Sequence, residues 1–408
     1  MEVLTGRNLW NLIQEIDYLR EGHTTKECAV FKMNKIKLYS FFSGCGLLDL
    51  GMEQAGFDIA MVSEKYEPFL AAYKYSRERM GIEEPEHGYL NDDICDYLRD
   101  NSKLDILIEQ DKKENIIGFI GGPPCPDFST AGKNKGVNGD NGKLSKTYFE
   151  LICKEKPDFF VFENVKGLWR TKKHKEFYDK MYSKMKSQGY YLLDKLLNSL
   201  EYGVPQERER VIMIGIKVRN QEDKDKLKDI VKNFNWGIRE YNVLEMIRNI
   251  DWPDTDPFME NSVTQPPQDI IRELTIQYWF DNNDVENHPN SVNFFRPKAG
   301  LTRMQTIEEG DVSRKSFKRL HRWRYSPTAA YGNNEVHLHP YKVRRLSIAE
   351  VLAIQSAPPE FELPLNMSLT DMFKTVGNGV PVLMAQKIGQ ELKPLLEMYF
   401  RDTRDNNI

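Results

Sequence analysis

The chain has 408 residues, of which 40% are hydrophobic and 29% are charged, and it carries a formal net charge of −4. This composition is typical of a globular protein long enough for two domains, and the longest apolar runs have only strand length, which excludes a membrane span. The small negative charge argues against a surface that coats nucleic acid nonspecifically, although it allows one basic face.

Cysteine usage limits the chemistry further. The five cysteines stand at 28, 45, 95, 125 and 153 without CxxC spacing. This spacing predicts neither a zinc site nor a disulfide framework, and the start of the chain lacks the apolar core of a signal peptide. We therefore expect a cytoplasmic protein that holds no metal.

The pattern of apolar residues changes after residue 34. Residues 1–34 are predicted to form a helical extension, which either packs on the sheet or binds a partner. From Lys35, short apolar runs alternate with helical segments, the pattern of a parallel α/β sheet. The predicted strands are 38–42, 59–63, 116–120, 158–162 and 211–216, and the predicted helices are 47–54, 68–79, 144–155 and 174–187.

The first two predicted strands end in residues that suit a nucleoside. Gly44 and Gly46 follow the first strand, where they allow a ligand to approach the backbone, and Glu64 ends the second, where it can accept from ribose hydroxyls. Asp93 and Ile94 follow a further short strand and could contact an adenine. A tight turn beside a solvated glutamate remains an alternative, since the third glycine of the dinucleotide fingerprint is absent.

A thiol follows the next strand. The run Ile116 to Gly122 leads through two prolines to Cys125, and the polar, glycine-rich stretch after it predicts an open loop through Ser145. A rigid turn of this kind pre-orients a nucleophile, provided that other groups lower its pKa. The alternative is a buried structural cysteine.

Charged residues mark two later strands. Glu163 ends an apolar strand and is expected to share a cleft with Cys125, unless it only caps the following helix. Arg208 and Arg210 enter another strand on one face, which suits a phosphate or a carbonyl oxygen as well as ordinary surface charge.

Beyond residue 216 the α/β pattern dissolves into a loop-rich stretch. Its end, Arg314 to Tyr325, interleaves basic and aromatic residues, which is typical either of phosphate contacts or of a solvated helix face. Arg344 to Glu350 is predicted to start a helix, and Thr375 to Val382 to form a turn into a terminal helix.

Taken in order, six motifs resemble those of the DNA (cytosine-5)-methyltransferases. They are Phe41-Phe-Ser-Gly-Cys-Gly, Gly121-Gly-Pro-Pro-Cys-Pro, Glu163-Asn-Val, Gln206-x-Arg208-x-Arg210, Arg344-x-Leu-Ser and Gly377-Asn-Gly-Val-Pro. The resemblance implies a Rossmann-like, S-adenosylmethionine-dependent methyltransferase sheet with a second, smaller, loop-rich target-recognition domain. It places the catalytic domain at 35–216, target recognition at 217–342 and a C-terminal segment that returns to the catalytic domain at 343–408.

The same resemblance implies the chemistry. Cys125 would add to C6 of a cytosine flipped out of duplex DNA, so that C5 can attack a methyl group, and the loop after Cys125 would close over the base. Glu163 would bind N3 and the exocyclic amine with the help of a proton, and Arg210 would bind O2. Arg208 would act in the same site by ordering the loop or a phosphate.

S-adenosylmethionine is the implied methyl donor, and S-adenosylhomocysteine the product. The residues expected to bind it are Phe42, Ser43, Gly44, Cys45, Gly46, Leu47, Glu64, Asp93, Ile94, Pro124, Asn378 and Val380. Ser40, Leu47, Pro126 and Gln355-Ser-Ala-Pro depart from the family's usual residues, which predicts local repacking without loss of a catalytic group.

These motifs predict a monomeric modification enzyme that acts on double-stranded DNA at the nucleoid. Whether a restriction endonuclease acts separately beside it stays open, as does the target sequence. The rival interpretations are a tRNA-modifying member of the family, a catalytically silent DNA-binding relative and a nucleotide-dependent dehydrogenase. The last of these leaves Cys125 and Glu163 unexplained.

Overall fold

The computed structural model describes residues 35–124, 140–238, 243–297, 300–314, 316–329, 331 and 336–404. The chain divides into two units, Met1–Lys35 and Ile36–Ile408, and the strands and helices that follow belong to the second unit. The helical extension predicted over 1–34 lies outside the described residues. Among the described helices, none is both long and apolar enough to cross a membrane.

In the described part of the chain, a seven-stranded sheet has the order β3-β2-β1-β4-β5-β8-β6. Its strands are β1 (Ile36–Phe41), β2 (Asp58–Ser63), β3 (Tyr89–Leu90), β4 (Ile116–Gly121), β5 (Phe159–Val165), β6 (Tyr190–Asn198) and β8 (Glu209–Lys217). β1 to β5 pair in parallel, whereas β8 pairs antiparallel with both β5 and β6. The five predicted strands and the α/β class are confirmed. The edge strand β6 was not predicted, because Asp194 and Lys195 interrupt its apolar pattern.

Helices connect the parallel strands and continue through the rest of the chain. They are α2 (Leu47–Gln54), α3 (Glu67–Arg79), α4 (Lys103–Asp111), α5 (Asp140–Glu155), α6 (Lys166–Arg170), α7 (Lys172–Ser187), α8 (Gln221–Ile230), α9 (Val243–Arg248), α10 (Ile276–Asn282), α11 (Leu301–Gln305), α12 (Ile348–Ile354), α13 (Leu369–Asn378) and α14 (Val382–Arg404). The four predicted helices and the helix start within Arg344–Glu350 are confirmed. The turn predicted over Thr375–Val382 is wrong for residues 375–378, which form the last turn of α13, whereas the terminal helix α14 begins at Val382 as predicted. The loop predicted through Ser145 is wrong for residues 140–145, which form the first turns of α5, where the buried Ser145 precedes the buried Tyr148 and Phe149.

Short elements complete the fold. The 3-10 turns are η1 (Ile94–Leu98), η3 (Ser199–Tyr202), η4 (Val231–Asn233), η5 (Arg272–Leu274) and η6 (Pro289–Val292). A second small sheet pairs β7 (Gln206–Glu207) with β9 (Ser326–Pro327) in parallel. This pairing ties the start of β8 to a segment more than a hundred residues further along the chain.

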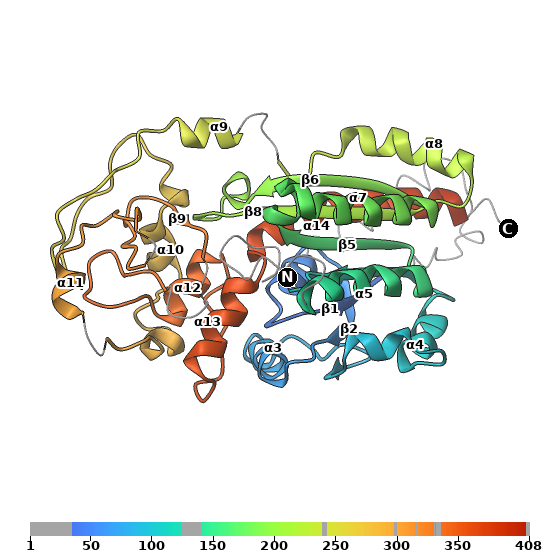
Figure 1. Cartoon of the computed structure of the whole chain (residues 1–408), viewed down its shortest axis with the longest axis horizontal. Helices are drawn as coiled ribbons and strands as arrows, with labels where there is room; N and C mark the ends of the chain where they lie inside the picture. The colour runs from blue at the N-terminus through green and yellow to red at the C-terminus, as the bar shows by residue number, and fades with distance from the viewer. Residues whose placement is uncertain are drawn as a thin grey trace, which may run out of the picture. The chain divides into compact units, whose positions relative to one another are not determined.

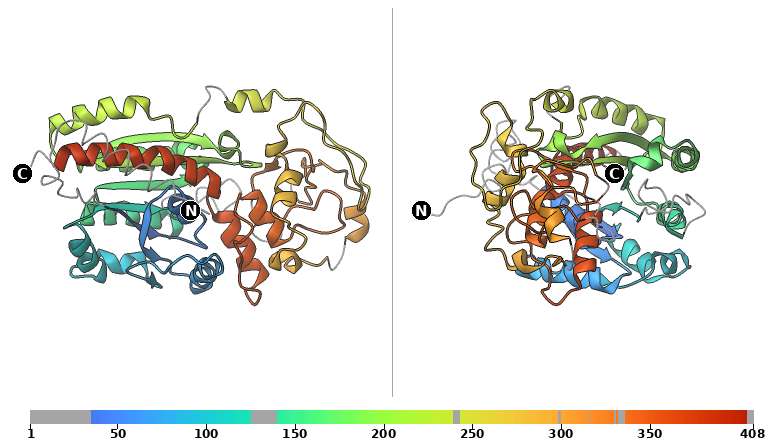
Figure 2. Two further views of the ribbon diagram at one scale, coloured as in Figure 1. Left: turned by 180° about the vertical axis from the view of Figure 1, so that it is seen from behind. Right: turned by 60° about the vertical axis from the view of Figure 1, so that its left-hand side comes forward.

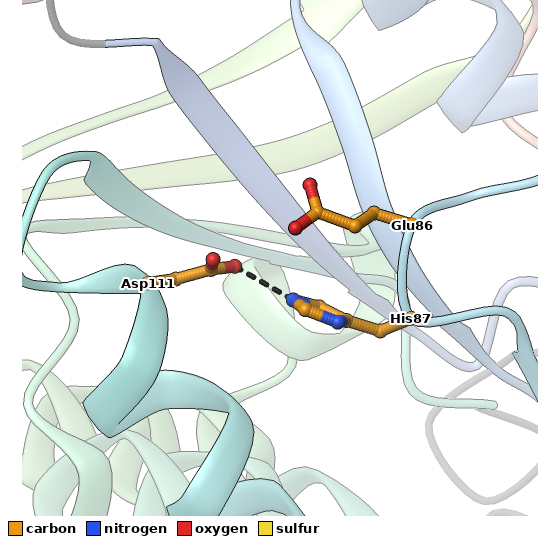
Figure 3. A group of neighbouring side chains, drawn as sticks. All are labelled: Glu86, His87 and Asp111. Atoms are coloured by element: carbon orange, nitrogen blue, oxygen red, sulfur yellow. Dashed lines mark hydrogen bonds and ion pairs between the residues drawn. The ribbon is translucent and has the colours of Figure 1, made fainter.

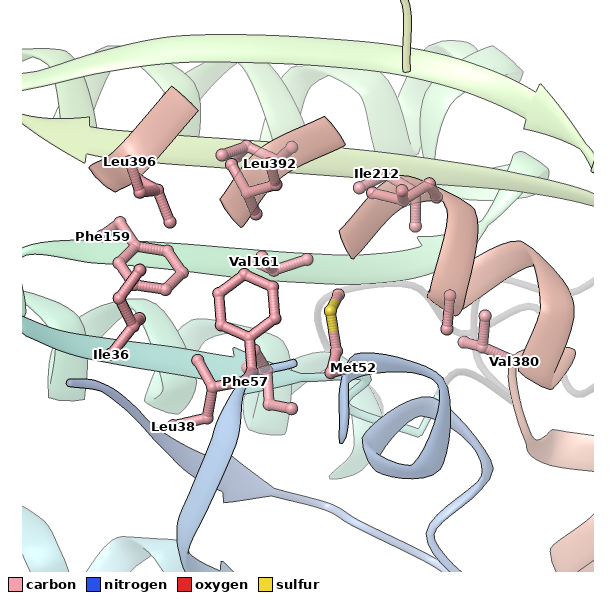
Figure 4. Packing of buried hydrophobic residues seen from close by; sticks show 14 of the residues in the cluster. Ile36, Leu38, Met52, Phe57, Phe159, Val161, Ile212, Val380, Leu392 and Leu396 are labelled. Atoms are coloured by element: carbon pink, nitrogen blue, oxygen red, sulfur yellow. The ribbon is translucent and has the colours of Figure 1, made fainter. Parts of the chain in front are cut away.

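Successive residues of β5 face opposite sides of the sheet, as strand geometry requires. Phe159 and Val161 belong to one buried core, and Phe160 and Phe162 belong to the other. On the first face the long helix α14 lies across the strands, as the view from behind shows (Figure 2). Its Leu392 and Leu396 face the strand residues of that core (Figure 4).

The described residues within 243–342, which we call the loop-rich segment, gather with α12 and α13 beyond the end of the sheet where β5 finishes (Figure 1). In the described part of the chain they contribute no residue to the two cores that flank the sheet. A third core joins them to the helices next to the sheet through Leu47, Phe280 and Leu352, among others. The carboxyl ends of the parallel strands therefore face this segment.

Candidate active site

The predicted site residues come from neighbouring strands. β2, β1, β4 and β5 lie side by side in parallel, so their carboxyl ends lie together at one end of the sheet. We call this carboxyl end of the strands the sheet edge. In such sheets ligands bind at this edge. The chain therefore brings the turns that follow these four strands together, although they are far apart in the sequence.

Glu163 and Arg210 form an ion pair at this edge. Glu163 lies near the end of β5, and Arg210 lies near the start of the antiparallel β8 beside it, with Val165 opposite Arg210 in the register. Arg210 Nε lies 2.9 Å from Glu163 Oε1, and both side chains are about nine-tenths buried. β8 runs antiparallel to β5, a direction that the sequence does not predict. This direction places Arg210 against the Glu163 carboxylate.

Burial raises the pKa of Glu163, while the nearby Arg210 and Arg208 guanidinium groups oppose that rise. Gly122 lies directly against this carboxyl group, because a Cβ atom added there would stand 2.6 Å from Glu163 Oε2. A larger residue at this position would therefore push the Glu163 carboxyl group out of its present place. The sequence marks Gly122 only as part of a motif and predicts no role for it.

Cys125 itself lies outside the described residues. The chain is described up to Pro124, which is half-buried and follows Gly122 and Pro123 at the end of β4. The base of the predicted nucleophile loop therefore lies beside the Glu163 and Arg210 pair.

Arg208 is fully buried near that pair, and its hydrogen bonds go to the end of α13. Its Nη2 donates to the carbonyls of Gly377, Asn378 and Gly379, at 3.0, 3.2 and 2.9 Å, and its Nη1 donates to Ala329 O at 3.3 Å. Because burial is the main cause, the pKa of Arg208 falls well below its usual range. This geometry suits a residue that holds the turn after α13 in place.

Two buried glutamines reinforce the same turn. Gln206 Nε2 donates to Gln355 Oε1 at 3.0 Å, and Gln355 Nε2 donates to Val376 O at 2.6 Å. Gln206 Oε1 also accepts from the backbone of Ala329. Together with Arg208, these side chains satisfy main-chain groups that no regular ladder reaches.

The turn after β1 has the shape that a closely approaching ligand requires. Phe42, Gly44 and Gly46 all have positive φ angles, of 56°, 57° and 85°. A Cβ atom on Gly46 would stand 2.5 Å from the ring of Tyr73. Arg77 Nη2 donates to Gly46 O at 3.1 Å and so fixes the end of the turn.

Ser40, a departure from the family's pattern, has a partner on α2. Its Oγ donates to Asp49 Oδ1 at 2.9 Å, and the hydroxyl of Tyr73 donates to Asp49 Oδ2 at 3.0 Å. Burial raises the pKa of Asp49, which is fully buried. The helix thus supplies a carboxyl group beside the serine, which is the local repacking that the departure predicts.

Glu64 ends β2 beside this turn. Its Oε2 accepts from Gly44 N at 3.0 Å and its Oε1 from Tyr66 N at 2.8 Å. Burial raises the pKa of its carboxyl group. Since a carboxylate oxygen has two lone pairs, both oxygens keep acceptor capacity for ribose hydroxyls, and the set fits a nucleoside.

Asp93 is already engaged in the fold. Its carboxylate pairs with Lys65 at 2.5 Å and caps η1 by accepting from Cys95 N at 3.0 Å. The Lys65 contact is the main reason why the pKa of Asp93 is lowered. Its next neighbour Ile94 is buried, as an adenine-contacting residue at the base of a site would be.

The remaining predicted cofactor residues divide by exposure. Ser43 and Asn378 reach solvent, whereas Cys45, Leu47 and Val380 are buried. Burial raises the pKa of the Cys45 thiol to about 11, so this cysteine stays neutral. A Cβ atom on Gly379 would stand 2.6 Å from Leu47 Cδ1, which shows how closely the C-terminal turn packs on the first helix.

One cluster with metal-ligating side chains lies at the opposite end of the sheet, at the amino end of β1. Glu86, His87 and Asp111 lie together, and His87 Nε2 is 2.8 Å from Asp111 Oδ2 (Figure 3). The ammonium group of Lys37 lies 2.7 Å from carboxylate oxygens of both Glu86 and Asp111. The protein therefore supplies the cation of this cluster itself.

Comparisons with known proteins agree with this geometry. Residues 36–394 match the model of the C-5 cytosine-specific DNA methylase family. The chain is 51% identical to the type II methyltransferase M.NmeDI of Neisseria meningitidis serogroup C, over 98% of this chain and 94% of that protein. It is 30% identical to M.FnuDI of Fusobacterium nucleatum, over 88% of this chain and 95% of that protein.

Solved structures share the fold. A putative DNA modification methyltransferase from an Escherichia coli prophage matches with a TM-score of 0.57 at 22% identity, and covers 90% of this chain and 99% of its own. The Entamoeba histolytica methyltransferase EhMeth matches with a TM-score of 0.55 at 14% identity, over 90% and 99% of the two chains. Given the match over 36–394, the chain belongs to the C-5 cytosine-specific DNA methylase family and is an enzyme of that kind.

Proposed function

We propose that this enzyme methylates C5 of one cytosine within a specific duplex DNA sequence, as the modification enzyme of a type II restriction system. The type II methyltransferase names of its relatives, at 51% and 30% identity over nearly the whole chain, support this assignment. We also propose that it acts as a monomer, with any restriction endonuclease acting separately.

The observation that carries the proposal is the buried pair of Glu163 and Arg210 beside the base of the Cys125 loop. Burial raises the pKa of the Glu163 carboxyl group and so favours its protonated form, which can donate to N3 of a cytosine ring. Arg210 then binds O2 of the same ring. Both contacts stabilise the ring as its charge changes during attack at C6.

Cys125 is the proposed nucleophile. Its thiolate forms a bond to C6 of the flipped cytosine, and the C5=C6 electron pair becomes available at C5. Bound S-adenosylmethionine supplies an electrophilic methyl group on a sulfonium sulfur. After methyl transfer, the C5 proton passes to solvent, and its C–H electron pair re-forms the C5=C6 double bond and expels the Cys125 thiolate, which releases 5-methylcytosine.

The cofactor is proposed to lie along the turns after β1 and β2. Glu64 accepts from its ribose hydroxyls, Phe42 packs on its adenine, and Ile94 lines the base of the site. Arg208, Gln206 and Gln355 hold the turn after α13, so that Asn378 and Val380 close the far side.

Residues 217–342 are the proposed target-recognition domain. Their first part, through residue 238, packs with the sheet, since Leu227 and Trp236 belong to its first core. The loop-rich segment beyond it faces the carboxyl ends of the strands and is the part proposed to contact DNA.

The direct test measures methyl transfer from labelled S-adenosylmethionine to unmethylated genomic DNA and to bulk tRNA. We expect label in DNA as 5-methylcytosine, and its loss in Cys125→Ser. Cys153→Ser, in the half-buried part of α5, is the matched control and should retain activity.

Bisulfite sequencing of the product DNA then identifies the target site. Label in tRNA alone would move the function to the tRNA-modifying branch of the family. Full activity in Cys125→Ser would exclude the covalent mechanism.

A further inference from the structure

The basic run that the sequence marks for nucleic-acid contact is largely used inside the fold. Arg319 is fully buried and donates to main-chain carbonyls, including Ile307 O at 2.9 Å and Lys342 O at 3.1 Å. Arg322 forms a buried ion pair with Glu309 at 2.7 Å. Neither guanidinium group is available to a ligand, so these two arginines are not cations that meet DNA.

Two other arginines are held on one aromatic ring. The guanidinium carbon of Arg303, on α11, lies 5.0 Å from the ring centre of Phe317, and that of Arg345 lies 5.9 Å from the same ring. Arg345 is also 5.9 Å from the ring of Phe295. Aromatic faces attract guanidinium groups at these distances and limit their motion.

Neither arginine has an acidic partner among the residues that the structure describes. Within those ranges no ion pair forms at Arg303 or Arg345, whereas the adjacent Arg344 pairs with Glu350 at 2.6 Å. Burial alone lowers the pKa of Arg345. Arg303 is exposed, whereas Arg345 is partly desolvated. A partly desolvated cation such as Arg345 that lacks an anion is unfavourable, and an anionic ligand would relieve that cost.

The backbone that presents the ring is strained. Phe317 has a φ of 59°, in the left-handed region that a bulky side chain rarely adopts. Its ring tip rests on Gly300, where an added Cβ atom would be 3.8 Å away, and Gly300 begins the helix that carries Arg303. Such strain is retained where the surrounding structure fixes it, and it commonly marks binding sites.

We propose that Arg303 and Arg345, held by Phe317, bind the phosphodiester backbone of the DNA duplex. The inference rests on the proposed function and assigns to these two residues the positioning of DNA on the loop-rich segment. Guanidinium groups bind phosphate oxygens in pairs of hydrogen bonds, and a contact with the face of an aromatic ring does not use up their N–H donors. Phosphate contacts fix position and carry no sequence information.

The test compares DNA binding by wild type, Arg303→Gln, Arg345→Gln and the double variant over a series of KCl concentrations. The probe is a short duplex that contains the site mapped by bisulfite sequencing. Each lost phosphate contact should reduce the slope of log K against log salt by about 0.9, and should weaken binding about tenfold at low salt. The double variant should lose about twice that slope, while the methylated sequence stays the same.

Arg314→Gln is the matched control, since Arg314 lies on the same segment but already pairs with Asp311 at 3.2 Å. Its slope should stay close to that of wild type, and an equal reduction there would indicate diffuse electrostatics and overturn the inference. Arg345→Lys keeps the charge without the planar stack, so it should bind with an intermediate affinity even if Arg345→Gln folds poorly.

Unchanged slopes in both single variants, with normal methylation by wild type, would overturn the inference and leave the proposed function intact. Failure of wild type to methylate any DNA would overturn the proposed function first. Thermal unfolding and S-adenosylmethionine binding by each variant separate a lost contact from a lost fold.

Discussion

The sheet and the loop-rich segment are stabilised in different ways. On the sheet, alternate residues of each strand fill two apolar cores, and main-chain groups pair with one another in the ladders. The described residues of the loop-rich segment form few such ladders, and buried polar side chains take their place. Arg319, Arg322 and Asn290 all lie in this segment and donate to main-chain carbonyls.

This contrast shows where polar residues serve the fold and where they serve chemistry. At the sheet edge Glu163 and Arg210 are buried although the ladder does not need their side chains, so these can serve a substrate. In the loop-rich segment, buried cations replace the missing ladder, because an unsatisfied carbonyl inside a protein costs free energy. Arg208 lies at the sheet, but it also donates to main-chain carbonyls, so its side chain serves the fold.

The largest expected effect tests the sheet edge. Glu163→Gln removes the group that supplies a proton to the base, so methylation should fall about 10²–10⁴-fold. Binding of S-adenosylmethionine, measured by titration, should remain close to that of wild type because Glu64 is untouched. Glu209→Gln, on the same β8 edge and paired with Lys166, is the control that should keep its activity.

A second prediction tests whether the loop-rich segment depends on its buried cation. Arg319→Met leaves several carbonyls unsatisfied, so unfolding free energy should fall by at least about 3 kcal/mol in urea titrations. Arg314→Met, which removes an exposed guanidinium a few residues away, should leave the unfolding midpoint close to that of wild type. Equal unfolding midpoints for the two variants would contradict the dependence of the loop-rich segment on the buried Arg319.

The glutamine pair connects the two regions and should have a smaller effect. Gln355→Leu leaves the buried Gln206 Nε2 group without its acceptor and removes one of the two donors to Val376 O, which predicts a loss of about 2–4 kcal/mol in stability. Because the turn after α13 loosens, KM for S-adenosylmethionine should rise more than kcat falls. A change in kcat alone would indicate that Gln206 and Gln355 affect the chemical step instead.

The smallest expected effect is a loss of folding stability at acidic pH, and it concerns the loop-rich segment. Burial lowers the pKa of His337 to about 3, against 6.5 for the free side chain. The neutral His337 side chain contributes its full stabilisation of the folded protein above pH 6.5. This stabilisation is lost as the pH falls from 6.5 toward 3, because the unfolded chain takes up the proton first.

Wild type should therefore lose about 2 kcal/mol from this group alone between pH 7 and pH 5. His337→Gln should lose correspondingly less over the same interval, as measured by urea unfolding at each pH. Parallel pH profiles for the two proteins would contradict this prediction.

The strands and helices of the sheet could be predicted because their signals are local. The apolar runs before Gly44, Glu64 and Glu163 have strand length, and each ends in a residue that breaks the run. Parallel order then brings the ends of these strands to one edge. The edge strand β6 escaped prediction because its half-buried position mixes polar with apolar residues.

The α/β class, the order of the motifs and the residue types of the site can be predicted from the chain alone, since each depends on neighbours along the chain. Which arginine serves which purpose depends on the three-dimensional fold. Arg208 meets Gly377 across 169 residues, and Arg210, two residues later, meets Glu163 instead. No local pattern separates the two, because a guanidinium group acquires its role from partners that the fold brings to it.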